Sequence, residues 1–415
     1  MQYPRNKKIC SHNSKRKDPY LLVVAIDFGT SYSGYAYSTR DDFLTDESKV
    51  FTIQPCNSNV QNMLSYKTPT CLLVNENKEF VAFGYDAESK YAELCSSGDE
   101  SKYFYFQKFK MNLYQGLLLE DFMRHMLKLL DFFTALLSGS QDPSHNSTHC
   151  PMISPAMTAF DIGGKMMPAI DVFSLSIEAL VNDFRERRKR SGLEFIHFSD
   201  IKWVLTVPAI WSERARNFMR NCAIKAGIPD ENLSIALEPE CASIFCQSLR
   251  PERIIGGSFG FKASENGCKY MIVDIGGGTV DIAVHEKMEG QKLKELCRAT
   301  GGDCGGTSVD RKFLKVMKQL FGDEIGTEFR TNEPESFLDL IRSFETIKRN
   351  IKTNTKGTMN VQIPYVTLTE FCELKYGKKI DDHVNSSEFK SSITVFKGHF
   401  RIENEFLRVQ NSCKN

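Results

Sequence analysis

The chain has 415 residues and a formal net charge of +1, from 53 basic and 52 acidic side chains. Hydrophobic residues make up 41% and charged residues 25% of it, which is ordinary for a globular protein and excludes disordered, collagen-like and mucin-like chains. The balanced charge also argues against a generally basic nucleic-acid binder, and the length predicts two or three domains.

The first 19 residues are polar and basic, and we expect them to form a disordered, solvated tail. No apolar run precedes Leu21, so the tail does not read as a secretory signal, and no later stretch reaches the roughly 20 residues of a transmembrane segment. The 13 cysteines have no metal-ligand spacing, which predicts reduced thiols and a cytoplasmic protein. The basic run 185–190 leaves a nuclear location open, although it also suits a solvated helix end.

An apolar run at 20–26 predicts a strand that is covered on both faces. It ends in a small, polar turn at 27–34, headed by Asp27, and the apolar pattern then resumes. This order is strand, turn, strand, which differs from a Walker loop or a dinucleotide-binding fingerprint. Shorter strands are expected at 50–53, 70–74 and 80–83, helices at 117–137 and 170–188, and an insertion near 138–160.

A second buried strand is expected at 203–209, where it ends in proline. Ser212 is a suitable N-cap for a helix with helical apolar spacing that Gly227 ends. Another helix should start near Pro239 and run to about residue 249. The glycine-rich segment 250–267 is the expected connection between two lobes.

Residues 270–284 repeat the first pattern of apolar strand, aspartate, glycine-rich turn, threonine and second strand. Because Asp27 and Asp274 head equivalent turns, we interpret the chain as a duplicated two-lobe architecture. Glycine turns let backbone N–H groups approach an anion, and hydroxyls at Thr30, Ser31 and Thr279 can add donors.

The carboxylates of Asp27, Asp274 and Asp281 suit a hydrated Mg²⁺. Two such hairpins facing each other would clamp a polyphosphate, which is what phosphoryl transfer needs most. The alternative is that both turns are tight hairpins in which glycine serves only the backbone geometry.

These motifs resemble those of the heat-shock 70 kDa protein family. Ile26–Ser33 and Met271–Val284 are similar to its two phosphate motifs, and Trp203–Ala209 to its connecting strand. Glu238–Ser243 looks like the start of the helix that carries its catalytic glutamate. Finer matches resemble the atypical heat shock 70 kDa protein 12 branch of the family, at Phe106–Met111, Val207–Trp211, Leu237–Glu240 and Ala299–Gly302.

The resemblance implies an α/β, actin-like ATPase fold, with duplicated ribonuclease-H-like lobes around a nucleotide cleft. Lobe I would span 20–250 and a partial lobe II 251–415. It implies weak ATPase activity, ATP or ADP with Mg²⁺ as cofactors, and lobe closure that signals to protein partners in a chaperone-like manner. A non-catalytic scaffold and a metabolite kinase are the alternatives, since fold alone does not decide function.

The resemblance also assigns roles to single residues. Asp27 and Asp274 would hold Mg²⁺ through water, Glu238 would position that water or act as a base, and Lys108 would orient the attacking water. Lys110 replaces Lys108 if the alignment is shifted. The nucleotide itself would contact Gly29, Thr30, Ser31, Tyr32, Gly276, Gly277, Gly278, Thr279, Asp281, Gly305, Gly306, Asp310, Glu345 and Lys348.

Some of these assignments have simpler alternatives. Lys108 could be a surface lysine, Glu238 an acidic helix start, and Glu345 with Lys348 a surface i,i+3 pair. Two departures from the family also matter. No Gly-Gly pair follows Gly305-Gly306, so we expect lobe II to be incomplete and to lack one wall of the adenosine pocket. We also expect no peptide-binding domain of the family's kind within these 415 residues.

Overall fold

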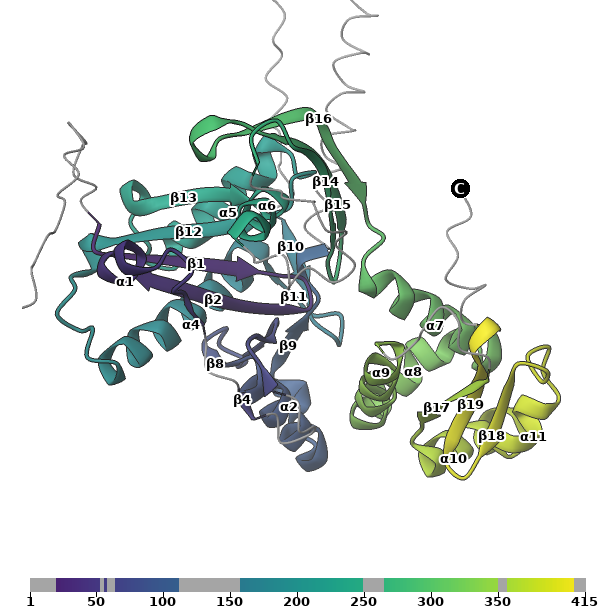
Figure 1. The fold of residues 1–415 in the computed structure, drawn as a ribbon. Coiled ribbons are helices and arrows are strands. Elements are labelled where there is room, and N and C mark those ends of the chain that lie inside the picture. Colours follow the sequence, from purple (N-terminus) through teal and green to yellow (C-terminus); the bar gives the residue numbers. More distant parts are fainter. Residues whose placement is uncertain are drawn as a thin grey trace, which may run out of the picture.

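The computed structural model describes residues 20–52, 56–57, 64–111, 157–248, 265–349 and 357–406 (Figure 1). The expected tail, the helix expected at 117–137, and most of the expected insertion and inter-lobe connection lie outside these residues. Among the helices described, none combines the length and the apolar character needed to cross a membrane. Below, lobe I means the described residues of 20–248 and lobe II those of 265–406.

A mixed sheet with the strand order β13–β12–β1–β2–β3 organises lobe I. β1 (Leu22–Phe28) and β2 (Tyr32–Thr39) form an antiparallel hairpin that β3 (Phe51–Thr52) extends. On the other edge of β1, β12 (Ile201–Val207) and β13 (Leu233–Leu237) run parallel to it. The strands expected at 20–26 and 203–209 are therefore confirmed, with slightly different ends.

The core of lobe I is aromatic and lies between this sheet and two helices, α4 (Ala169–Arg190) and α5 (Glu213–Lys225). Phe28 and Phe173 lie 5.6 Å apart between ring centroids, and Trp203 is fully buried. Ser212 caps α5 as expected, because its Oγ accepts a hydrogen bond from the backbone N–H of Ala215.

The remaining elements of lobe I are short. A small sheet contains β7 (Cys71–Val74), β8 (Phe80–Phe83) and β9 (Phe104–Gln107), which confirms two of the expected strands. The other elements are α1 (Arg40–Thr45), β4 (Cys56–Asn57), β5 (Leu64–Ser65), β6 (Thr68–Pro69), α2 (Tyr85–Ser97), β10 (Thr158–Phe160), β11 (Met166–Pro168) and α6 (Glu238–Ser248).

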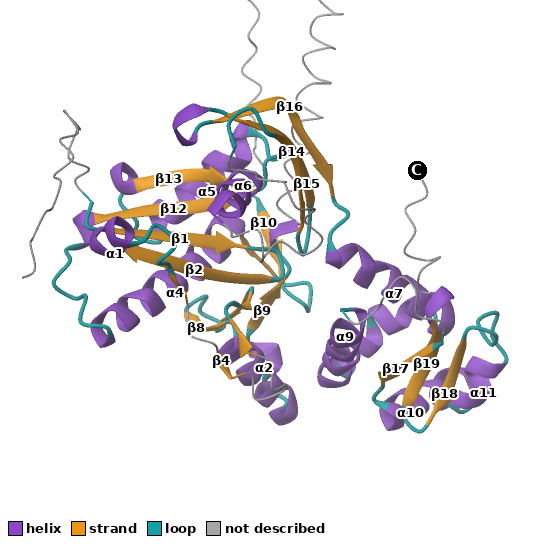
Figure 2. Cartoon of the chain, in the orientation of Figure 1, coloured by secondary structure: helices purple, strands orange, loops and turns teal. Residues whose placement is uncertain are grey.

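Lobe II begins with the same hairpin pattern. β14 (Lys269–Ile275), β15 (Val280–Lys287) and β16 (Leu293–Gly302) form an antiparallel sheet in chain order. Among the described residues, β14 has no parallel neighbour to match the one that β12 gives to β1. Figure 2 shows strands and helices in both lobes, and the duplicated hairpins confirm the expected α/β, actin-like arrangement.

The rest of lobe II has a core of its own, in which Phe313 and Phe344 stack with ring centroids 3.9 Å apart. It touches lobe I where α9 (Pro334–Lys348) packs beside α2, with Leu338 buried against Tyr91 and Tyr105. Its elements are α7 (Gly306–Phe321), α8 (Glu328–Asn332), α9 (Pro334–Lys348), β17 (Thr358–Gln362), α10 (Tyr365–Tyr376), α11 (Ile380–Asn385), β18 (Ile393–Phe396) and β19 (His399–Glu403).

Candidate functional site

The turn between β1 and β2 and the turn between β14 and β15 meet at one place. A Cβ atom added to Gly277 would overlap the side chain of Ser31, and one added to Gly278 would overlap Thr30 Oγ1. Any side chain at these two positions would therefore push the turns apart. The glycines of the second turn allow the two lobes to touch at their hairpin tips.

The second turn rests on the first residues of α7. The N–H groups of Gly305, Gly306 and Thr307 donate to the carbonyl oxygens of Gly278, Gly276 and Gly277, at 3.0, 3.1 and 2.7 Å. The first N–H groups of a helix have no partner within the helix, so this contact satisfies them and orients the turn at the same time. It also predicts little tolerance for a side chain at Gly305.

A cavity of about 960 Å³ opens between the two turns, which is large enough for a small-molecule ligand. Most of the residues assigned from the sequence line it: Asp27, Gly29, Thr30, Ser31, Tyr32, Glu238, Asp274, Gly276, Gly277, Gly278, Thr279, Gly306, Glu345 and Lys348. Four assigned residues are not among its lining residues: Lys108, Asp281, Gly305 and Asp310.

Three carboxylates gather in the cavity. Burial raises the pKa of Glu238, with help from the charges of Asp27 and Asp274, while Lys110 acts in the opposite direction. Burial likewise raises the pKa of Asp274, and the carboxylates of Asp281 and Asp27 add to the effect. Carboxylates held this close favour the binding of a positive charge.

Two lysines from lobe I supply such charge. Lys110 is almost fully buried, pairs with Glu238 at 3.0 Å, and lies with its ammonium nitrogen 5.1 Å from the ring centroid of Trp211. Lys67 forms an ion pair with Asp27, at 48% and 40% side-chain exposure. The sequence analysis missed Lys67, because no motif marks it and only the pairing of β6 with β2 brings it near Asp27.

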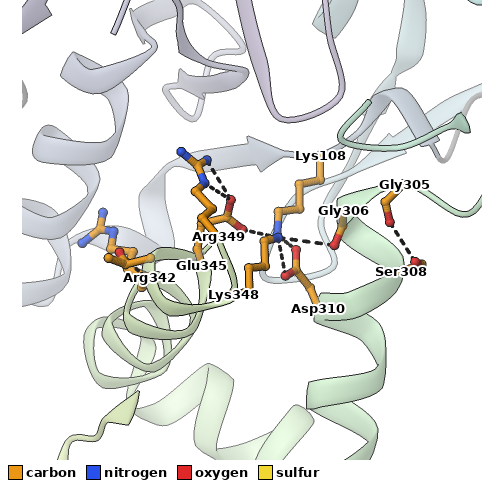
Figure 3. A network of polar contacts seen from close by, with 10 residues as sticks. Lys108, Gly305, Gly306, Ser308, Asp310, Arg342, Glu345, Lys348 and Arg349 are labelled. Carbon is orange, nitrogen blue, oxygen red and sulfur yellow. Dashed lines mark hydrogen bonds and ion pairs between the residues drawn. The ribbon is translucent and has the colours of Figure 1, made fainter. Parts of the chain in front are cut away.

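Lys108, the first choice from the resemblance, lies elsewhere. Its ammonium group pairs with Asp310 at 2.7 Å, and Lys348 pairs with the other oxygen of Asp310 at 2.6 Å. Figure 3 shows these two lysines, from different lobes, converging on Asp310. The geometry therefore favours Lys110, the alternative in the shifted alignment, as the lysine that faces the cavity.

Asp281 is also turned away from the cavity. Its side chain is buried, and its Oδ1 accepts a hydrogen bond of 3.1 Å from the backbone N–H of Ile210. In this position Asp281 ties the second hairpin to the loop that follows β12. Its side chain is therefore not among those that line the cavity, although its charge still acts on Asp274.

The far wall of the cavity comes from the end of α9. Lys348 pairs with Glu345 at 2.5 Å, and Glu345 also pairs with Arg349 at 2.8 Å. Arg349 lies with its guanidinium carbon 5.0 Å from the ring centroid of Tyr32. Arg349 was not singled out from the sequence, although it lines the cavity and directly follows Lys348.

Comparisons of the sequence with known proteins all point to heat-shock 70 kDa proteins. Residues 199–392 match the family model described as "Hsp70 protein". The chain is 30% identical to human heat shock 70 kDa protein 12A over 433 residues, and 28% identical to human heat shock 70 kDa protein 12B over 425 residues. It is 25% identical over 187 residues to the chaperone protein DnaK of Methanothermobacter thermautotrophicus, which is 45% of this chain and 28% of that protein.

The matches to the two human proteins cover 93% and 91% of this chain. The chain spans only about half of their length, at 57% and 56%. Among solved structures, the ADP-bound MreB5 of Spiroplasma citri matches with a TM-score of 0.44 and 12% identity, over 94% of this chain and 74% of that one.

Proposed function

Because the chain is related to the heat-shock 70 kDa protein family, with similarity to proteins 12A and 12B over most of its length, we propose that it binds ATP and ADP in the cavity between its two hairpin turns. We further propose that it hydrolyses ATP weakly, and that closure of the lobes on the nucleotide signals to protein partners. The meeting of both turns at one cavity is the observation that carries this proposal.

Backbone groups would bind the phosphates. The first turn, at Gly29 to Tyr32, and the second, at Gly276 to Thr279, both border the cavity, so their N–H and hydroxyl groups can donate to phosphate oxygens. The turns come from different lobes, so a polyphosphate held by both would link the lobes. This link is the proposed origin of lobe closure.

Lys110 and Glu238 would carry the hydrolytic step. The buried ammonium of Lys110 can orient the transferred phosphoryl group. Glu238 is a suitable base because its burial raises its pKa, and a carboxylate with a raised pKa accepts a proton more readily. Glu345 and Lys348 would lie at the adenosine end of the cavity.

The residues present fit Mg²⁺, which prefers carboxylate oxygens and water as ligands. Asp27 and Asp274 both line the cavity next to the phosphate turns and would hold the ion through water. When bound, Mg²⁺ would neutralise part of the phosphate charge. Asp27 already has Lys67 as a partner, so the protein itself supplies part of the neutralising positive charge.

We also propose a cytoplasmic location for the protein.

Calorimetric titration of MgATP and MgADP into the chain tests the binding. We expect micromolar or tighter affinity for the wild type, and no measurable binding for Gly277→Glu, because a side chain at Gly277 would overlap Ser31 and push the turns apart. Asp99→Ala, at a surface ion pair outside the cavity, is the matched control and should bind normally. If the wild type shows no binding, the chain is instead a scaffold that keeps the fold without nucleotide.

A further inference from the structure

We propose that the ammonium group of Lys67 supplies, at Asp27, the positive charge that Mg²⁺ would otherwise supply, so that a nucleoside diphosphate binds this chain with little dependence on divalent cations. The inference rests on the proposed function, because it concerns the same cavity. It goes beyond that function because it assigns to one lysine the charge-neutralising role of a metal ion.

The position of Lys67 is fixed by the first hairpin turn. Lys67 directly precedes β6, which pairs with β2, and Thr70 anchors the segment that follows. The N–H of Thr70 donates to the carbonyl oxygen of Ser31 at 2.9 Å, and its hydroxyl donates to that of Gly29 at 2.8 Å. The segment that carries Lys67 is therefore hydrogen-bonded to the turn that is expected to bind phosphate.

On the other side of this segment, Thr68 packs against Gly84, and a Cβ added to Gly84 would overlap the side chain of Thr68. The Oγ1 atom of Thr68 also accepts a hydrogen bond of 3.1 Å from the N–H of Tyr85. The backbone on the C-terminal side of Lys67 is thus held on two sides. The ammonium group itself is at the end of a long, half-exposed side chain. It can reach from Asp27 to a phosphate oxygen without movement of the backbone.

The charges in the cavity explain why this lysine matters. Asp27, Glu238 and Asp274 face two lysines of lobe I, Lys67 and Lys110. Lys110 is committed to Glu238 and Lys67 to Asp27. Lys348 and Arg349 of lobe II also line the cavity, but both pair with Glu345. Without Lys67, the carboxylate of Asp27 would therefore lose its ammonium partner and repel an incoming diphosphate unless a metal ion came with it.

Few side chains in this cavity are available as ligands for a metal ion. Among the residues that the structure describes, no group of three or more histidine, cysteine, aspartate or glutamate side chains is arranged to hold a metal. Of the two carboxylates assigned to Mg²⁺, Asp27 already has an ammonium partner. The carboxylate of Asp274 is then the stronger remaining attraction for a cation.

The test compares ADP affinity with Mg²⁺ and with EDTA, by calorimetry, for the wild type, Lys67→Met and Lys102→Met. Methionine keeps the apolar stem of the lysine and removes its charge. Lys102 pairs with Asp99 in a surface ion pair of similar exposure outside the cavity, so Lys102→Met is the matched control.

We expect the wild type and Lys102→Met to bind ADP about equally well in both conditions, within about threefold. In Lys67→Met the ratio of the two affinities should rise by about tenfold or more, because binding in EDTA is lost while binding with Mg²⁺ remains. Lys67→Arg should restore the wild-type ratio. A wild type that needs Mg²⁺, or a Lys67→Met ratio equal to that of the control, overturns the inference and leaves the proposed function standing.

If no variant binds ADP in either condition, the proposed function is wrong, and a second measurement still tests the charge at Asp27. Mn²⁺ is titrated into the nucleotide-free chain and followed by electron paramagnetic resonance. Lys67→Met should bind Mn²⁺ about tenfold more tightly than the wild type, since the carboxylate of Asp27 is released. Equal Mn²⁺ affinities would overturn the inference here as well.

Discussion

The two hairpins that head the lobes have the same sequence pattern but different surroundings. In β1 of lobe I, Val24 and Phe28 are completely buried. In β14 of lobe II, Val273 and Ile275 are 45% and 72% exposed. β1 has a parallel neighbour and packs against an aromatic core. Among the described residues, β14 pairs with β15 alone and has α6 beside it.

This difference separates two properties that a strand-and-turn pattern does not distinguish. The turn at the tip of each hairpin forms through its glycines and through pairing within the hairpin, and the second turn has additional support from the start of α7. Both turns therefore reach the cavity. Coverage of the strand is determined by segments far away in the chain. A turn that lines the cavity can therefore be in place on a strand whose apolar side chains remain exposed.

The largest expected effect is on the free energy of unfolding, when an aspartate is placed in β1 and, for comparison, in β14. Val24→Asp should lower the free energy of unfolding by about 4 kcal/mol or more, because an unpaired carboxylate would be buried in the core. Val273→Asp should lower it by about 1 kcal/mol or less, since its side chain reaches solvent. Urea denaturation followed by circular dichroism measures both, and equal losses would contradict the described difference between the strands.

The second comparison is between two lysines that lie two residues apart in lobe I. Lys110→Met should lower the rate of ATP hydrolysis by about a hundredfold or more, because a buried cation facing the phosphates is lost. Lys108→Met should change the rate much less, because its charge is used on Asp310. Single-turnover hydrolysis measures both rates. The reverse order would restore Lys108 as the phosphate lysine.

A third prediction concerns the support of the second turn. In Gly305→Ala the new Cβ would lie 2.6 to 2.8 Å from backbone atoms of Gly276 and Gly278, so the turn must shift and nucleotide affinity should fall about tenfold. Gly302→Ala is the control, because its Cβ would meet only Cys304 Sγ at 3.8 Å. Titration of MgADP into both variants decides, and equal affinities would show that α7 does not hold the turn.

The smallest effect is a dependence of stability on pH. Since the pKa of Asp274 is raised in the folded chain, the folded state keeps a proton there that the unfolded state has lost. The free energy of unfolding should then fall as the pH rises above the ordinary aspartate value of 3.8 and through the raised pKa. Glu238 contributes with the same sign.

Asp274→Asn removes the contribution of Asp274. At pH 7 this variant should gain up to about 1 kcal/mol in stability without nucleotide, a small value because the carboxylate is only half-buried and solvent screens it. At pH 4 the gain should vanish. Urea denaturation at both pH values provides the measurement, with Asp99→Asn at the protein surface as the control. A gain that is the same at both values would exclude the titration of Asp274 as its cause.

Much of the fold could be predicted because its signals are local. The apolar run before Asp27, the cap at Ser212 and the glycine turns each act over a few residues. The choice between Lys108 and Lys110 could not be predicted in this way. β9 ends at Gln107, and Lys108 has a positive φ of 53°, so the alternation of side chains along the strand does not continue to Lys110.

Contacts between distant segments could not be predicted from the sequence either. Asp281 follows the second turn just as a cavity residue would, yet its carboxylate accepts a hydrogen bond from Ile210, 71 residues away. Lys67 meets Asp27 only because β6 adds to β2. Neither contact produces a recognisable pattern in the sequence. The motifs therefore predicted the kind of chemistry in the cavity but not the position of every charged side chain.

The contact between Lys110 and Trp211 gives the cavity an optical signal. The chain contains only two tryptophans, and the other, Trp203, lies in the core of lobe I. When tryptophan is excited selectively, a Trp203→Phe chain would therefore emit from a single indole, whose ring centroid is 5.1 Å from the Lys110 ammonium nitrogen. Any ligand that draws Lys110 away from Glu238 would change the electric field at that indole and shift its emission. The occupancy of the cavity can then be followed in real time with no added dye.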